Sequence, residues 1–339
     1  FEEGYYLSPC LSFVKNTSKS KRLNGGRAID LTPQSRKNIF MGATSPILSK
    51  DIVRPIAKRS DLWGAWLTFH VWAVCIGAGA MFVLLPNPLT FLLAFLLIGS
   101  RQHGMAILMH DAAHGVLFKT KSLNEFVGTW LLAAPYGGNL QAYRHYHLKH
   151  HRHTQTELDP DLPLSAKFPT SKASLKRKLI RDLTGQTFWR LRLASLKGVE
   201  LEGSDAFAKS SRTPIIVTNI IIFAALAALD VWWAYFALWL FPLMTWFMAV
   251  LRIRNIAEHA MTATDGNPFR YARTTKASLP ARIFLAPYWV NYHLEHHAYM
   301  YVPCYRLPTL HNAMQEAGYL PKMEYETSYT NVLKLASTG

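Results

Sequence analysis

The chain has 339 residues, of which half are hydrophobic and only 17% are charged. A soluble domain usually carries about 25% charged residues, so we expect part of the surface to face lipid. The 37 lysines and arginines outnumber the 21 aspartates and glutamates, and the net charge of +16 fits either a nucleic-acid-binding protein or a membrane protein with basic loops. Cys10, Cys75 and Cys304 are far apart and match no disulfide framework or zinc finger, so reduced thiols are expected.

Residues 1–60 are expected to form a basic tail that is disordered in part. The first 40 residues are polar and lack hydrophobic periodicity, and Met41 is a candidate for the true start of the protein. A native disordered tail is the alternative, and the sequence does not decide between the two.

Four stretches are apolar enough to be membrane-spanning helices: residues 62–85, 89–109, 214–229 and 231–251. About 20 apolar residues cross a bilayer, so three of these are long enough, whereas the third must borrow flanking residues or tilt. The only charge within them is Arg101. A charge at the bilayer centre costs roughly 2.5–3.5 kcal/mol, so we expect Arg101 near an interface.

Very short connections, residues 86–88 and Asp230, join these stretches in pairs, so the sequence predicts two helical hairpins. Neither connection is basic, and all lysines and arginines outside the spans lie in residues 1–61, 110–213 and 252–339. By the positive-inside rule, both termini and the long middle segment are cytoplasmic. This distribution accounts for the charge without nucleic acid, and no stacking-aromatic or helix-turn-helix pattern is present.

Two further apolar stretches, residues 126–136 and 283–290, are too short to cross a bilayer. We expect them at the membrane interface or packed beneath the cytoplasmic part. The predicted membrane domain covers residues 61–320, and residues 321–339 are expected to be a C-terminal tail.

Histidines are concentrated in three short clusters after or between the apolar stretches: His110 with His114, then His147, His150 and His151, then His293, His296 and His297. Positions i, i+3 and i+4 share one face of a helix, so each cluster would present its imidazoles together. Eight imidazoles exceed the four ligands that satisfy one zinc ion, so two metals are implied. The absence of HExxH argues against a zinc protease, and nitrogen donors without a thiolate suit iron, copper or zinc.

Three more histidines lie near these clusters. His145 and His153 belong to the same stretch as the middle cluster, HYHLKHHRHT, but their side chains point away from its shared face. We therefore expect them to be exposed or packing residues and not ligands. His103, seven residues before His110, could line a substrate tunnel, although a packed role is favoured.

The clusters resemble the histidine boxes of the membrane fatty acid desaturase and hydroxylase superfamily. HDAAH (110–114), HLKHH (147–151) and HLEHH (293–297) come in the family's order, with two apolar stretches between the second and third, and the resemblance covers residues 60–320. It implies an all-α integral membrane fold: four transmembrane helices in two hairpins beneath a cytosolic helical cap that holds two iron ions in a histidine-rich di-iron site.

The same resemblance implies dioxygen as co-substrate and attack on an unactivated C–H bond of a membrane lipid or acyl substrate. It also implies a separate electron donor, namely a ferredoxin, a rubredoxin or a b-type cytochrome with its reductase, because the chain has no HPGG haem motif.

A ninth ligand is expected in RIRNIAEHA (252–260), which resembles the N-x-x-x-H element of acyl-CoA desaturases. By that resemblance His259 completes a nine-histidine site, and Asn255 holds a metal-bound water. The two residues are four apart and share a face if the last apolar helix continues past residue 251. The alternative is that both cap the helix and meet phosphate head groups.

Carboxylates could orient the imidazoles by accepting hydrogen bonds from their free N–H groups. We expect this of Asp159 and Asp161, because the stretch ELDPDLP directly follows the middle cluster. Asp111 and Glu295 lie within the boxes but are expected to be ordinary solvated carboxylates.

The favoured function is that of a fatty acyl desaturase. A hydroxylase or ketolase acting on a lipid or carotenoid is the first alternative, since the outcome after the first hydrogen is removed depends on sub-ångström placement. A metal transporter with histidine-rich loops is the second alternative, and it is disfavoured because the apolar stretches carry few polar or ionisable groups.

Overall fold

The computed structural model of the chain describes residues 47–196, 211–265 and 267–339. The description below concerns the compact unit formed by residues 46–339, as far as they are described. The hypotheses on Met41 and Cys10 fall outside the described residues. Cys75 and Cys304 are buried and unpaired with one another, as expected of reduced thiols.

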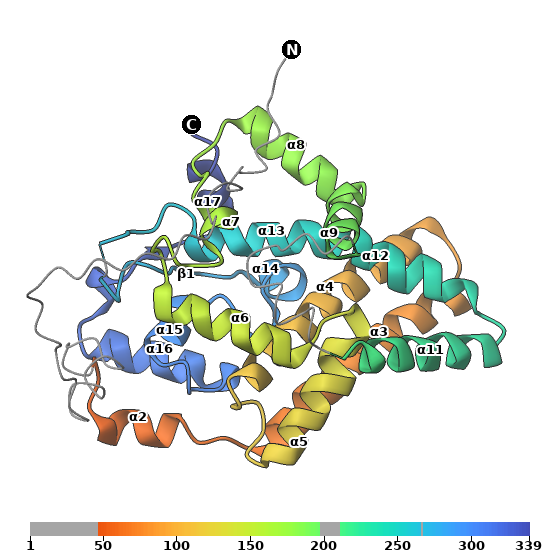
Figure 1. The fold of residues 1–339 in the computed structure, drawn as a ribbon, viewed down its shortest axis with the longest axis horizontal. Helices are drawn as coiled ribbons and strands as arrows, with labels where there is room; N and C mark the ends of the chain where they lie inside the picture. Colours follow the sequence, from red (N-terminus) through yellow and green to blue (C-terminus); the bar gives the residue numbers. More distant parts are fainter. Residues whose placement is uncertain (1–46, 197–210, 266) are drawn as a thin grey trace, which may run out of the picture. The chain divides into compact units, whose positions relative to one another are not determined.

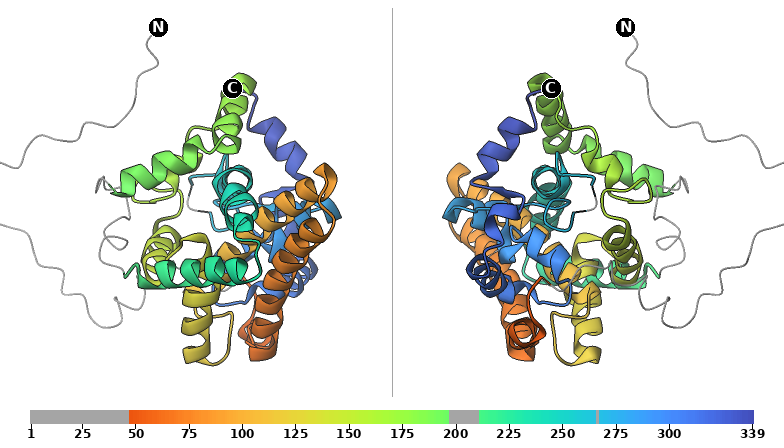
Figure 2. Two further views of the ribbon diagram at one scale, coloured as in Figure 1. Left: turned by 90° about the vertical axis from the view of Figure 1, so that its right-hand side faces the viewer. Right: turned by 90° about the vertical axis from the view of Figure 1, so that its left-hand side faces the viewer.

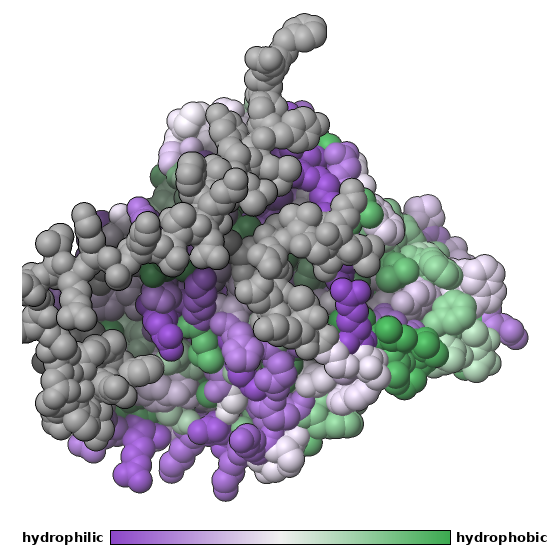
Figure 3. Space-filling view, viewed as in Figure 1, coloured by the Kyte–Doolittle hydropathy of each residue, from purple (hydrophilic) through white to green (hydrophobic). Residues whose placement is uncertain are grey.

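The protein is mostly helical, and three helices of the described chain are long and apolar enough to cross a membrane: α3 (Asp61–Leu84), α4 (Pro88–Ala113) and a composite helix, Tyr235–His259. The stretch predicted as the third span forms α11 (Thr213–Ala228), an apolar helix of 16 residues that is shorter than these. Ile216, Ile220 and Ile221 of α11 are more than half exposed, and hydrophobic side chains gather over this helix at the right of Figure 3. An exposed apolar surface of this kind suits contact with lipid.

The turn between α3 and α4 explains why α4 begins where it does. The Asn87 side chain accepts the N–H groups of Leu89 and Thr90, and the Thr90 hydroxyl accepts the N–H of Asn87. This capping box satisfies backbone groups that an isolated helix end leaves unpaired, and Pro88 takes the first helical position, where its missing N–H costs nothing. The two helices then pack along each other (Figures 1 and 2).

The composite helix contains a break that its sequence explains. It consists of the π-helix η3 (Tyr235–Leu240), α12 (Phe241–Met244) and α13 (Trp246–His259). Pro242 has no N–H to donate and crowds the preceding turn, which the wide π-helical turns accommodate. After Thr245, whose hydroxyl donates to the Phe241 carbonyl at 2.6 Å, the chain continues as regular helix. The last apolar helix therefore extends eight residues beyond the predicted end at residue 251, to His259.

The apolar stretch 283–290 contains the end of α14 (Leu279–Phe284) and the short 3-10 helix η4 (Pro287–Trp289), and it packs against α4. Polar side chains of α4 donate hydrogen bonds to its carbonyl groups. The Ser100 hydroxyl donates to the Phe284 carbonyl at 2.9 Å, and the buried Arg101 guanidinium donates to the Ile283 carbonyl. Backbone carbonyl groups that are buried away from water need such partners within the protein. Arg101 lies midway along α4.

Within this stretch Tyr288 and Trp289 have φ values of 52° and 59°, in the left-handed region. Gly104 of α4 makes room for the Tyr288 ring, because a Cβ atom at residue 104 would lie 2.6 Å from it. The Tyr288 hydroxyl lies 3.0 Å from Nδ1 of His70 on α3. The stretch thereby connects α3 and α4 through side chains as well as backbone.

The other elements surround the ends of α4 and α13. They are α2 (Lys50–Ile56), α5 (Lys121–Phe126), the π-helix η1 (Val127–Ala133), η2 (Ala134–Tyr136), α6 (Leu140–His153), α7 (Leu162–Ser165), α8 (Lys172–Leu183), α9 (Gln186–Leu196), α14 (Leu279–Phe284), η4 (Pro287–Trp289), α15 (His293–Ala298), η5 (Cys304–Arg306), α16 (Leu307–Glu316), η6 (Leu320–Lys322), α17 (Tyr329–Leu335) and the parallel strands β1 (Thr274–Thr275) and β2 (Tyr325–Glu326). The predicted C-terminal tail contains β2 and α17, and α17 packs against α13.

Candidate metal centre

Four elements bring histidine side chains together at the ends of the long helices. The last turn of α4 and the residue that follows it supply two, α6 supplies three, the last residue of α13 supplies one, and α15 supplies three. They form two sets. Within each set, one ring nitrogen of every histidine lies within 4.8 Å of the corresponding nitrogens of the others. The five-histidine group is His110, His114, His147, His151 and His296, and the four-histidine group is His150, His259, His293 and His297.

These are the nine histidines that the sequence predicts as ligands, but neighbours in sequence belong to different groups. His150 and His151 separate, as do His296 and His297. Successive side chains on a helix are about 100° apart, so two adjacent imidazoles reach different sides. Residues four apart stay together, as His147 and His151 do. The histidine face of α6 therefore spans both groups.

The distances between Nε2 atoms match those of ligands that share one ion. In the four-histidine group Nε2 of His293 lies 2.8 Å from that of His259 and 3.1 Å from that of His297. In the five-histidine group Nε2 of His151 lies 2.9 Å from that of His147 and 3.0 Å from that of His296. Nitrogens bound to one metal at about 2.0–2.1 Å are about 2.9–3.4 Å apart, close to these values.

The chemistry of the groups also fits a metal ion. Burial and the neighbouring imidazoles lower the pKa values of His147, His293 and His296 well below the usual value. Burial lowers the pKa of His114 to about 4. These four imidazoles are thus neutral at physiological pH, which is the form that binds metals. The Nε2 atoms of His110 and His114 are buried without a hydrogen-bond partner, as expected of atoms meant for an ion.

Two rings of the four-histidine group have a hydrogen-bond acceptor of the protein at Nδ1, the ring nitrogen other than Nε2. His150 Nδ1 lies 2.7 Å from Oδ1 of Asp159, a carboxylate that also accepts the N–H groups of Gln155 and Asp161 at 2.8 Å. His259 Nδ1 lies 3.2 Å from the Tyr271 carbonyl oxygen. A hydrogen bond at Nδ1 fixes the tautomer and leaves Nε2 with its lone pair toward the site.

A family model described as fatty acid desaturase matches residues 86–329, which include all nine histidines. The chain belongs to the fatty acid desaturase family.

The curated relatives are named either as desaturases or as ketolases. Dihydrorhizobitoxine desaturase of Bradyrhizobium elkanii is 30% identical over 245 residues, covering 67% of this chain and 68% of the relative. Beta-carotene ketolase of a Paracoccus species is 26% identical over 269 residues, covering 79% and 92%. The sn-1 oleoyl-lipid 12-desaturase of a Synechocystis species is 22% identical over 287 residues, covering 79% and 81%. Together with the three apolar helices, family membership indicates a membrane-bound oxidoreductase whose histidine groups could hold metal.

The other site residues of this desaturase-family chain lie near the groups but make different contacts. Asp161 Oδ2 lies 3.7 Å from His150 Nδ1, farther than Asp159, and its carboxylate accepts the Tyr146 hydroxyl. Asn255 lies one turn before His259 on α13, half-buried, and its side chain makes no hydrogen bond to the described residues. It therefore has amide donors and an acceptor to offer a water molecule.

The expectation that Asp111 and Glu295 are solvated is wrong, because both are buried. Asp111 accepts the Cys304 N–H at 2.7 Å and lies 3.5 Å from His110 Nδ1. Glu295 lies 2.5 Å from His311 Nδ1 and accepts the Thr274 hydroxyl. These partners come from segments distant in sequence, so the spacing within each box carried no sign of them.

Sequence reasoning missed Glu258, the residue before His259. Its carboxylate is buried, lies 3.5 Å from His293 Nε2 and pairs with Arg254 at 2.6 Å. The signal was present, since an arginine and a glutamate four apart share a helix face. The Arg254–Glu258 pair puts a buried carboxyl group beside the four-histidine group.

The three histidines predicted as non-ligands lie outside both groups. His145 is exposed and His153 is half-buried. His103 is fully buried, its ring packs edge-on against Phe247 with 6.0 Å between centroids, and neither ring nitrogen has a partner among the described residues.

Proposed function

We propose that the protein is an oxygen-dependent desaturase of a lipid alkyl chain, with one iron ion in each histidine group. The observation that carries the proposal is the division of nine histidines into two groups with ligand-like Nε2 distances. When bound, two irons supply the redox chemistry with dioxygen that side chains alone cannot perform on an unactivated C–H bond. Iron is chosen over copper and zinc because the chain belongs to a desaturase family and aliphatic oxidation needs a redox metal.

In this proposal the histidines are the ligands and their neighbours orient them. Asp159 keeps the His150 ring in place by accepting a hydrogen bond from the ring's Nδ1–H group. The backbone N–H of Asp161 in turn donates to the Asp159 carboxylate. The Tyr271 carbonyl does the same for His259. Asn255 orients a water molecule at the four-histidine group, a role that its unpaired amide can fill.

The proposed topology has four transmembrane helices in two hairpins, with the metal centre in a cytosolic cap and both termini cytoplasmic. The fourth helix is α11, which is apolar but short and needs flanking residues or tilt to span. The basic residues on one side support the orientation. Tags at both ends of the chain should be accessible only from the cytoplasm, and labelling of either from the opposite side would overturn the topology.

The proposed substrate is a membrane-borne acyl chain, as the names of the sn-1 oleoyl-lipid 12-desaturases and the family suggest. The electron donor is a separate ferredoxin, rubredoxin or b-type cytochrome with its reductase. A second candidate, a ketolase or hydroxylase acting on a lipid or carotenoid, is favoured by the beta-carotene ketolase relative, which is matched over 92% of its length.

One experiment separates these outcomes. The chain is expressed with a donor system in a host that lacks the activity, and its lipids and carotenoids are profiled by mass spectrometry. A desaturase product has lost two hydrogen atoms, whereas a hydroxylated product has gained an oxygen atom. A His151→Ala variant is the inactive control and a His145→Ala variant is the matched active control. An unchanged profile with iron-loaded wild-type protein would contradict both candidates.

A further inference from the structure

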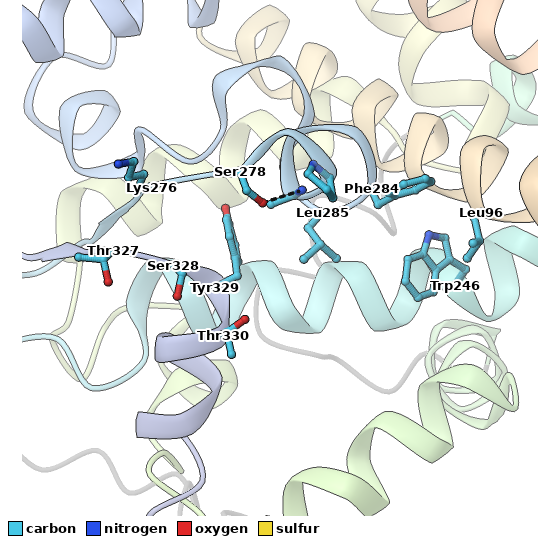
Figure 4. A pocket seen from close by; sticks show the side chains of 12 residues that line it. Leu96, Trp246, Lys276, Ser278, Phe284, Leu285, Thr327, Ser328, Tyr329 and Thr330 are labelled. Carbon is cyan, nitrogen blue, oxygen red and sulfur yellow. Dashed lines mark hydrogen bonds between the residues drawn. The ribbon is translucent and has the colours of Figure 1, made fainter.

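A groove of about 470 Å³ lies beside α13, away from the histidine groups. It is lined by residues of α14, of the first turn of α17 and by side chains of α4 and α13 (Figure 4). A volume of this size is typical of sites that bind small molecules, and it holds part of one lipid rather than a whole diacyl lipid.

The two ends of the groove differ in chemistry. Leu96, Trp246 and Phe284 form one end, and Figure 4 shows them together at the right. Lys276 and Thr327 lie at the other end, on the left of that view. Because Leu96 and Trp246 belong to helices apolar enough to span a membrane, the apolar end is the one that faces the bilayer interior.

The polar end offers hydrogen-bond donors without acidic competitors. No aspartate or glutamate lines the groove, and Lys276 is exposed with no ion pair to any described residue. The hydroxyl oxygens of Ser278, Thr327 and Ser328 each accept a hydrogen bond from the protein, at 3.4, 2.7 and 3.1 Å. None of these hydroxyls donates one within the described chain, so their protons remain available for an acceptor.

Among the acidic residues, Glu326 on β2 lies nearest in sequence to a residue that lines the groove, Thr327. Its carboxylate accepts the N–H of Thr327 at 3.3 Å, and the backbone N–H of Lys276 bonds to the Glu326 carbonyl at 2.8 Å. The backbone thus holds Lys276 beside β2, while its ammonium group stays without a carboxylate partner.

We propose that this groove binds one anionic phospholipid of the surrounding membrane. The phosphate meets the Lys276 ammonium and the hydroxyls of Ser278, Thr327 and Ser328, and one acyl chain lies along Trp246 and Phe284. Charge complementarity selects the head group, because Lys276 carries a positive charge and no carboxylate lines the groove. The apolar end selects a lipid over free phosphate, since it buries alkyl surface. The site is independent of the metal centre and of the reaction proposed above.

The test uses full-length protein purified in detergent after equilibration with phosphatidylglycerol and phosphatidylcholine in equal amounts. Native mass spectrometry then counts the lipids retained by each chain. Wild-type protein should retain one phosphatidylglycerol in preference to phosphatidylcholine. Lys276→Gln should reduce this preference about fivefold, the loss expected for one lysine beside an anionic head group. Lys322→Gln removes an exposed lysine outside the groove and should behave as wild type.

A second variant tests the apolar part. Ala281→Trp places a large ring inside the groove, and it should exclude both lipids while circular dichroism shows the helix content of the wild type. Equal retention of the two lipids by wild-type protein would overturn the anionic assignment, and so would an unchanged preference in Lys276→Gln. Displacement of the lipid by excess inorganic phosphate would show that the head group alone is bound. Retention by a folded Ala281→Trp protein would place the lipid elsewhere.

Discussion

The two histidine groups differ in how firmly the protein holds their rings. All members of the four-histidine group are buried, and His150 and His259 have protein acceptors at Nδ1. In the five-histidine group His114 and His151 are only partly buried, and among the described contacts the acceptor nearest an outer nitrogen is Asp111, 3.5 Å from His110. A ring fixed in advance loses less freedom when it binds a metal. The four-histidine group should therefore bind its metal more tightly, while the five-histidine group is more open to exchange.

The largest expected effect comes from removing a ligand of the tighter group. His259→Ala takes away one of its four imidazoles, so the iron content should fall by about half and turnover should be lost. Iron per chain is measured by mass spectrometry of the metal, alongside product formation. His145→Ala, whose ring lies outside both groups, is the matched control and should keep both. Full iron with normal turnover in His259→Ala would reduce the site to the eight histidines of the three boxes.

A smaller effect is expected from the residue that holds a ligand. Asp159→Asn keeps the shape of the side chain but removes the charge that favours the Nδ1–H tautomer of His150. Metal affinity should fall about 10–100-fold, in the four-histidine group only. Competition with a chelator of known affinity measures this change. Asp161→Asn, whose carboxylate is farther from His150, should have the weaker effect, and equal losses in the two variants would show that Asp159 does not act on the ring.

Asn255→Ala tests water orientation without removing a ligand. The variant should retain most of its iron and turn over about tenfold more slowly, comparable to the loss of a residue that acts through another group. Iron content and the rate under saturating substrate are measured on the same preparation. If iron is lost in parallel with the rate, Asn255 is needed for metal retention and the water role is wrong.

The smallest effect concerns the different solvent exposure of the two histidine groups. When wild-type protein is treated with a chelator, iron should leave in two phases, and the faster phase should belong to the five-histidine group because His114 and His151 are partly exposed. His296→Ala should remove the faster phase and His297→Ala the slower one. A single phase in wild-type protein would show that the groups do not differ in accessibility.

The residues of the site could be predicted from sequence, but their division could not. Helical spacing identified which imidazoles share a face, and an uninterrupted helix through Asn255 and His259 was foreseen from their spacing. The assignment of His150 and His151 to different groups depends on where α13 and α15 lie in space, which no local pattern contains. Asp111 and Glu295 were misjudged for the same reason, since their partners Cys304 and His311 lie elsewhere in the chain.

The fold shows the same limit. Apolar length located the long helices, yet it could not show that Arg101 donates to the backbone carbonyl of residue 283. A hydropathy pattern counts charges and does not show which carbonyl groups lack a partner. The break at Pro242 lies inside residues 231–251, which apolar length alone marks as one continuous span.

Helices α6 and α15 each contribute to both histidine groups and so fix the distance between them. Each carries adjacent histidines that belong to different groups, so the separation between the two groups is set by a single peptide step on each helix. Inserting one residue between His147 and His150 would rotate one histidine relative to the others by about 100° and disconnect the groups. A change in the length of α6 between residues 147 and 151 would therefore disturb both groups at once.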